Sequence, residues 1–126
     1  MAHQHSAAFI AIVDDAKARV KEVTVDETLA RLNANPDAVL IDVREESEWA
    51  AGHAIAAKHL GKGIIERDIE SVIPDHFTEL ILYCGGGFRS ALAGDALQKM
   101  GYRNVKSMAG GWRAWIAAGA PVTPQG

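Results

Sequence analysis

Short apolar runs alternate with amphipathic stretches along most of this chain. Two of the runs, residues 38–43 (AVLIDV) and 79–84 (ELILYC), are apolar almost throughout, which is typical of strands buried on both faces of a parallel sheet. Weaker runs at residues 21–25, 57–60 and 104–108 predict three more strands. We therefore expect about five strands.

The segments between these runs have the spacing of helices. The predicted helices cover residues 7–20, 27–36, 45–52, 63–73, 88–100 and 110–121. We expect Asp26 to cap the second helix and Pro36 to close it. In the fourth, Ile64, Ile65, Ile69 and Val72 are expected to share one buried face.

The alternation of strands and helices predicts an α/β fold, with a central parallel sheet of about five strands flanked by helices on both faces. No repeat, low-complexity tract or linker divides the chain. We expect residues 1–20 to form an N-terminal helical extension and residues 21–126 to form one domain. The extension could pack on its own sheet or on a neighbouring copy, and the oligomeric state is open.

Composition excludes several classes of protein. The chain has 126 residues, a net charge of -3 and a pI near 5.9, so it lacks the basic surface that nucleic-acid binding requires. No apolar stretch approaches the roughly 20 residues needed to cross a membrane. A single cysteine cannot form an internal disulfide, and the N-terminus lacks the features of a secretion signal. We therefore expect a cytoplasmic protein.

The stretch from Tyr83 to Ala91, YCGGGFRSA, combines several chemical groups at one strand-to-helix junction. Sites form at the carboxyl ends of strands in open parallel sheets, and a helix N-terminus favours a thiolate at Cys84. Glycines 85–87 can turn backbone N–H groups toward an anion. Arg89 adds a cationic fork suited to sulfonate, phosphate or carboxylate, and Ser90 adds a hydroxyl group.

A structural interpretation of the same residues is the natural alternative. Free cysteines are mostly small buried hydrophobic residues, and glycine-rich turns mostly connect elements. Three consecutive glycines, however, cost conformational entropy that a simple connection does not require. Their position between Cys84 and Arg89 favours a functional loop.

Three motifs in order, LIDVREESEWAAGH (40–53), YCGGGFRSA and GGWRAW (110–115), resemble the single-domain rhodanese-like sulfurtransferases over roughly residues 21–121. The resemblance implies that Cys84 carries a persulfide and that Gly85, Gly86, Gly87, Phe88 and Arg89 complete the active loop. It implies transfer of sulfur from a donor such as thiosulfate to cyanide, a small thiol or a protein thiol. Arg89 would hold the sulfonate of the donor. No metal or cofactor is implied.

The remaining motifs are expected to be structural. Asp42 and Arg44 at a strand end should form a buried pair, and residues 45, 46 and 48, all glutamates, should form a solvated helix start. Trp112 and Trp115 are expected in the core. Phe88 could equally line the pocket or anchor the next helix. The histidines have no metal-ligand spacing.

One segment departs from the family pattern. Where the family has Ile-Pro-Gly-Ala after Gly-His, this chain has Ala54, Ile55, Ala56 and Ala57. Loss of the proline and the glycine is expected to alter the turn before the third strand.

Two other functions remain as alternatives to sulfur transfer. Cysteine-dependent phosphatases and arsenate reductases place five residues between cysteine and arginine, whereas only four separate Cys84 from Arg89 here. The shorter loop offers fewer N–H groups and favours sulfur over phosphate. The second rival is a binding or regulatory module in which the loop is catalytically idle.

Overall fold

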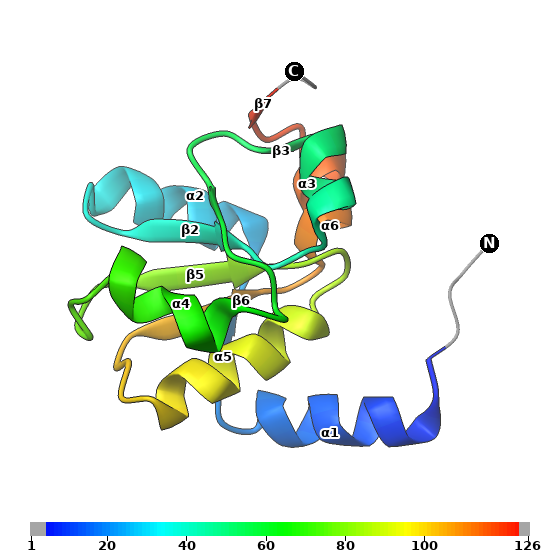
Figure 1. Cartoon of the computed structure of the whole chain (residues 1–126). Helices are drawn as coiled ribbons and strands as arrows, with labels where there is room; N and C mark the ends of the chain where they lie inside the picture. The colour runs from blue at the N-terminus through cyan, green and yellow to red at the C-terminus, as the bar shows by residue number, and fades with distance from the viewer. Residues whose placement is uncertain (1–4, 124–126) are drawn as a thin grey trace.

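The computed structural model describes residues 5–123, and its centre is a parallel sheet of five strands in the order β1-β6-β5-β2-β4 (Figure 1). The strands are β1 (Lys21–Val23), β2 (Val39–Asp42), β4 (Lys58–His59), β5 (Leu80–Tyr83) and β6 (Val105–Met108). Every neighbouring pair in this sheet is parallel. The predicted strand number and direction are confirmed.

Helices cover both faces of the sheet, as the alternating pattern predicts. One face carries α4 (Ile65–Val72) and α5 (Arg89–Lys99), and the other carries α2 (Val25–Ala34) and α6 (Gly111–Ala117) (Figure 1). The short α3 (Glu46–Ala51) lies near α6, at the end of the sheet where the strands finish.

The middle strand, β5, supplies both halves of the core. Leu80 and Leu82 pack toward α4 and α5, whereas Ile81 and Tyr83 pack toward α2 and α6, and all four are fully buried. Successive side chains of a strand point to opposite faces, so a strand covered on both sides must be apolar at every position. Burying each large side chain contributes about 1.5–3 kcal/mol. This burial fixes the end of β5, where Cys84 follows.

Two local details differ from the sequence predictions. Thr24, not Asp26, caps α2, because the Thr24 hydroxyl accepts a hydrogen bond from the Glu27 N–H (3.0 Å) and the Glu27 carboxylate accepts one from the Thr24 N–H (2.8 Å). This reciprocal pair satisfies two N–H groups at the helix start. In α4, Val72 is exposed, and Ile73, just after the helix, is buried in its place.

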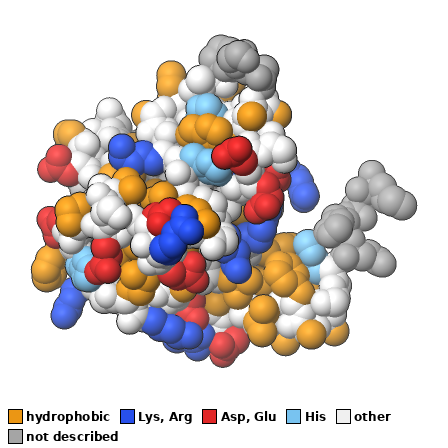
Figure 2. Space-filling view, in the orientation of Figure 1, with side chains coloured by type: hydrophobic (Ala, Val, Ile, Leu, Met, Phe, Trp, Pro, Cys, Tyr) orange, Lys and Arg blue, Asp and Glu red, His pale blue; other side chains and the backbone are white. Residues whose placement is uncertain are grey.

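The N-terminal helix α1 (Ala7–Lys17) packs along α5 of its own chain. Val13 and Ala16 are buried. The Arg19 guanidinium binds both carboxylate oxygens of Asp95 at 2.8 Å, which ties the end of this segment to α5. Figure 2 shows hydrophobic side chains gathered over α1 and charges of both signs scattered over the rest of that face.

A second, two-stranded antiparallel sheet joins β3 (His53–Ala54) to β7 (Val122–Thr123). It was not predicted: each strand has two residues and directly follows a segment whose pattern predicts a helix. The segment that departs from the family pattern follows β3, and Ala56 there has a φ of +66°, the left-handed conformation that favours glycine. Ala56 therefore adopts a backbone conformation that glycine would suit better.

Candidate active site

Cys84 lies immediately after β5, at the carboxyl edge of the sheet, and the loop of residues 85–88 connects it to α5. Its side chain is buried. The backbone N–H groups of Gly87 and Ser90 donate to the cysteine sulfur at 3.1 and 3.3 Å. Such donors suit a sulfur atom that carries negative charge.

Ser90 links this sulfur to the neighbouring strand. The Cys84 thiol donates to the Ser90 hydroxyl at 3.5 Å, and that hydroxyl bonds the hydroxyl of Ser107 in β6 at 2.8 Å. Ser90 and Ser107 are both fully buried. The hydroxyl group expected from Ser90 is thus present beside the sulfur, but its partner Ser107 was not anticipated.

The loop is bound to the first turn of α6 through backbone atoms. The Trp112 N–H donates to the Cys84 carbonyl at 2.7 Å, and the Arg113 N–H donates to the Gly85 carbonyl at 3.2 Å. This contact requires Gly111, because a Cβ atom there would lie 2.2 Å from the Cys84 carbonyl oxygen. The close approach fixes α6 relative to the cysteine.

The three loop glycines differ in what a side chain at each position would meet. Only Gly87 of the three has a left-handed backbone, with a φ of +100°, and a Cβ atom on it would lie 3.2 Å from the Gly110 nitrogen. A Cβ atom on Gly85 would lie 3.1 Å from Arg89 Nη2, and one on Gly86 would lie 3.5 Å from Arg113 Nη1. Two guanidinium groups therefore flank the loop.

Arg89 forms an ion pair with Glu48 of α3, which the sequence analysis placed on a solvated face. Arg89 Nη1 and Nη2 donate to the two carboxylate oxygens of Glu48 at 2.9 and 3.2 Å. The hydrogen bonds to Arg89 lower the pKa of Glu48, and the same bonds raise the pKa of Arg89. The expectation of a solvated Glu48 is therefore wrong, because the fold brings α3 to the loop.

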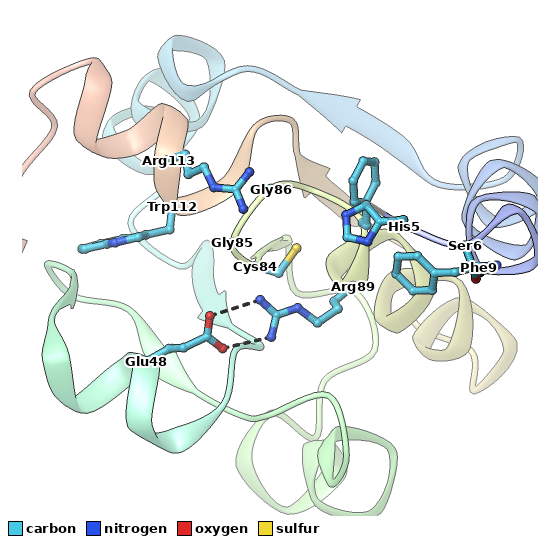
Figure 3. A pocket seen from close by; sticks show the side chains of 11 residues that line it. His5, Ser6, Phe9, Glu48, Cys84, Gly85, Gly86, Arg89, Trp112 and Arg113 are labelled. Atoms are coloured by element: carbon cyan, nitrogen blue, oxygen red, sulfur yellow. Dashed lines mark hydrogen bonds and ion pairs between the residues drawn. The ribbon is translucent and has the colours of Figure 1, made fainter. Parts of the chain in front are cut away.

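These groups line a cavity of about 710 Å³ (Figure 3). Its lining comes from the loop, α3, α6 and the start of α1, and comprises His5, Ser6, Phe9, Glu48, Cys84, Gly85, Gly86, Phe88, Arg89, Trp112 and Arg113. Of the candidate site residues from the loop, Cys84, Gly85, Gly86, Phe88 and Arg89 line the cavity, whereas Gly87 and Ser90 contact the Cys84 sulfur from behind the lining. The sequence analysis missed the lining residues of α1, α3 and α6, which only the tertiary fold brings to the cysteine.

One wall of the cavity is aromatic. The Phe88 ring packs edge-on against the rings of His5 and Phe9, with centroids 4.7 and 6.2 Å apart. The Lys17 ammonium lies 5.1 Å from the centroid of the Phe88 ring. Of the two roles considered for Phe88, the structure shows the one at the pocket wall.

Behind the site, Asp42 and Arg44 form the expected buried pair. Arg44 donates to both carboxylate oxygens of Asp42 and to the Gly52 carbonyl at 2.7 Å. Its guanidinium lies 4.5 Å from the ring of Trp112, which lines the cavity, whereas Trp115 is buried in the core. The prediction that both tryptophans are core residues is confirmed for Trp115, whereas Trp112 is only partly buried and packs between the core and the cavity.

Residues 5–123 contain neither a metal-ligand cluster nor a membrane-spanning helix. No three His, Cys, Asp or Glu side chains in that range lie close enough together to hold a metal ion. His53 and His59 instead stack against Trp49, at 3.4 and 4.9 Å between ring centroids. Over the same part of the chain, no helix is long and apolar enough to span a bilayer.

Comparisons with known proteins agree with this geometry. The family model for the rhodanese-like domain matches residues 24–118. Thiosulfate sulfurtransferase GlpE of Pseudomonas putida is 32% identical over 100 residues, which cover 79% of this chain and 89% of that protein. The solution structure of a polysulfide-sulfur transferase homodimer from Wolinella succinogenes superposes with a TM-score of 0.81 and 30% identity, over 94% of this chain and 88% of that one.

A further similar structure is that of a protein of unknown function from Rhodopseudomonas palustris, described as a possible tyrosine phosphatase. It superposes with a TM-score of 0.84 and 26% identity, over 98% of this chain and 99% of that one.

Proposed function

Because this chain belongs to the rhodanese-like domain family, within which its relatives include sulfurtransferases, we propose that it moves a sulfane sulfur from a small donor to a thiophilic acceptor through a persulfide on Cys84. The single observation that carries the proposal is the Cys84 sulfur at the base of the cavity, with two backbone N–H groups donating to it. That arrangement suits an anionic sulfur nucleophile and the anionic persulfide it would become.

The reaction has two displacement steps. The Cys84 thiolate attacks the outer sulfur of thiosulfate, the sulfur–sulfur bond of the donor breaks, and sulfite leaves with that bonding pair. An acceptor thiolate or cyanide then attacks the outer sulfur of the persulfide and releases the Cys84 thiolate. Neither step needs a metal or an external oxidant.

Each residue of the loop has a proposed role. Gly87 and Ser90 would stabilise the sulfur anion through their N–H groups, while Gly85 and Gly86 leave room above it for donor and acceptor. Arg89 and Phe88 line the cavity and would contact the substrates from the side. The names of the relatives support two donor classes, thiosulfate and polysulfide. A reactive cysteine with no second cysteine in the chain suits a reducing compartment such as the cytoplasm.

The test is the intact mass of the reduced protein before and after thiosulfate. We expect a gain of one sulfur atom, about 32 Da, that cyanide removes and that Cys84→Ser does not show. Absence of that gain in a folded protein would overturn the proposal.

The test also separates the two rivals. A phosphatase would hydrolyse an aryl phosphate without gaining sulfur, and the description of the Rhodopseudomonas palustris structure is the reason to include that assay. A binding module would do neither.

A further inference from the structure

The two guanidinium groups beside the loop, those of Arg89 and Arg113, differ in whether a carboxylate pairs with them. Arg89 lies over Gly85 and is paired with both oxygens of Glu48, so its charge is largely neutralised at the site. The Glu48 carboxylate is itself held in place, because it also accepts a hydrogen bond from the Glu45 N–H at 2.9 Å. An anion that approached Arg89 would meet this fixed carboxylate.

Arg113 carries the other guanidinium, and within residues 5–123 its side chain has no ion pair and no hydrogen bond. Figure 3 shows it directed toward the loop from the α6 side, opposite Glu48 and Arg89. Its backbone is nevertheless fixed, because the Arg113 N–H binds the Gly85 carbonyl and the preceding residue binds the Cys84 carbonyl. The Arg113 backbone is therefore fixed beside the nucleophile, and its exposed side chain carries an uncompensated charge.

A free guanidinium in this position fits one class of ligand. Its planar fork of N–H groups matches two oxygens of a sulfonate or carboxylate. Gly86 lacks a side chain, and a Cβ atom there would lie 3.5 Å from Arg113 Nη1, so the guanidinium lies close to the loop and lines the same cavity as Cys84.

We propose that Arg113, not Arg89, binds the anionic end of the sulfur donor, and that Glu48 keeps Arg89 from doing so. This inference rests on the proposed sulfur transfer. It assigns to α6 a donor-binding residue that lies outside the active loop of residues 84–89. It also makes compact oxyanions the preferred class of sulfur donor.

The first experiment does not depend on sulfur transfer. Iodoacetate and iodoacetamide both alkylate a thiolate with loss of iodide, and they differ mainly in the negative charge of the acetate. We expect Arg113→Ala to lower the ratio of the rate with iodoacetate to the rate with iodoacetamide at Cys84 about fivefold. A change of this size is the effect of losing one partly exposed ion pair. Any change in the reactivity of the thiolate itself cancels in this ratio.

Arg103→Ala is the matched control. It removes the same charge from an exposed arginine whose guanidinium lies over Phe77, outside the cavity. A ratio in Arg113→Ala within twofold of that in Arg103→Ala would overturn the inference. So would a fivefold fall in both variants, which would indicate an effect of net charge alone.

The second experiment uses thiosulfate itself. With a fixed acceptor, we expect Arg113→Ala to raise the KM for thiosulfate about fivefold, whereas Arg103→Ala leaves it unchanged. If thiosulfate loads no sulfur but the alkylation ratio still falls, the anion site stands and the proposed function fails. If sulfur loads normally and the ratio does not change in Arg113→Ala, the function stands and this inference fails.

Discussion

Glu48 in α3 holds the Arg89 guanidinium with both of its carboxylate oxygens, at 2.9 and 3.2 Å, although the two residues are 41 positions apart in the chain. The pair sets the charge on one side of the cavity, because a carboxylate lies where an anionic donor would otherwise bind. It also gives the loop an electrostatic partner that lies outside the loop sequence.

Glu48→Gln should therefore raise kcat/KM for thiosulfate about three- to tenfold. The substitution removes a negative charge from the cavity and leaves Arg89 able to contact the donor, which is worth on the order of 1 kcal/mol. Steady-state kinetics with cyanide as acceptor measure the effect. Glu46→Gln, an exposed change in the same helix, serves as the control. A fall in kcat/KM would mean instead that the pair is needed to position Arg89.

Gly111→Ala should damage both stability and sulfur loading, because its Cβ atom would lie 2.2 Å from the Cys84 carbonyl oxygen. Gly119→Ala is a close control: Gly119 is also left-handed, with a φ of +70° against +53° for Gly111, but nothing lies within 4 Å of its Cβ position. We expect the control to lose about 1–2 kcal/mol through backbone strain alone and to load sulfur normally.

For Gly111→Ala we expect a loss of more than about 3 kcal/mol, since the clash adds to the same strain. Urea denaturation and the mass assay measure the two properties. Equal losses in the two variants would show that the contact between α6 and the loop is not needed.

Glu79→Gln should destabilise the protein most at neutral pH. The Glu79 carboxylate is buried and accepts hydrogen bonds from Arg31, Asn35 and Lys106, and those from Arg31 do most to lower its pKa to about 2. Removing its charge leaves the cations of Arg31 and Lys106 without an ion-pair partner, at a cost of about 2–4 kcal/mol.

The pH dependence follows from the direction of that shift. A carboxylate whose pKa is lower in the folded protein than the ordinary 4.5 contributes stability above pH 4.5 and loses it as the pH falls toward 2. The difference between wild type and Glu79→Gln in urea unfolding should therefore shrink over this interval. Glu66→Gln, an exposed change, should show little difference at any pH. A constant difference for Glu79→Gln would contradict the prediction.

Ala56→Gly should stabilise the protein by about 0.5–1 kcal/mol. Ala56 has a φ of +66°, which costs an alanine about 1–2 kcal/mol, and part of the gain is offset by the greater freedom of glycine in the unfolded chain. Ala50→Gly, within α3, should lose about 1 kcal/mol. Thermal unfolding of the two variants gives the comparison, and a loss of stability in Ala56→Gly would show that the turn carries no strain.

The strands and helices could be predicted from sequence because the patterns that indicate them are local. A strand buried on both faces must be apolar throughout, and β5 shows this in four consecutive residues. The loop could also be found, since a cysteine, three glycines and an arginine in one short turn are uncommon in a plain connection. The capping box of α2 was visible too, in the spacing of Thr24 and Glu27, but Asp26 is an equally good cap by residue type.

There is a physical reason why the residues that line the cavity outside the loop could not be predicted. Glu48 and Arg113 approach the loop only because α3 and α6 both lie at the carboxyl edge of the sheet, and neither has a local signal that distinguishes it from a surface charge. For Phe9 and Phe88, the contact depends on the docking of α1 against α5. These relationships are set by packing between distant segments.

The order in which a ribosome makes the chain has a consequence for the cysteine. Val23 at the edge of the sheet pairs with Met108, and the Cys84 carbonyl binds the N–H of Trp112, so both contacts wait for the last part of the chain. Cys84 is translated before either can form. The newly synthesised polypeptide therefore passes through an interval in which its thiol is present without the helix that holds its loop.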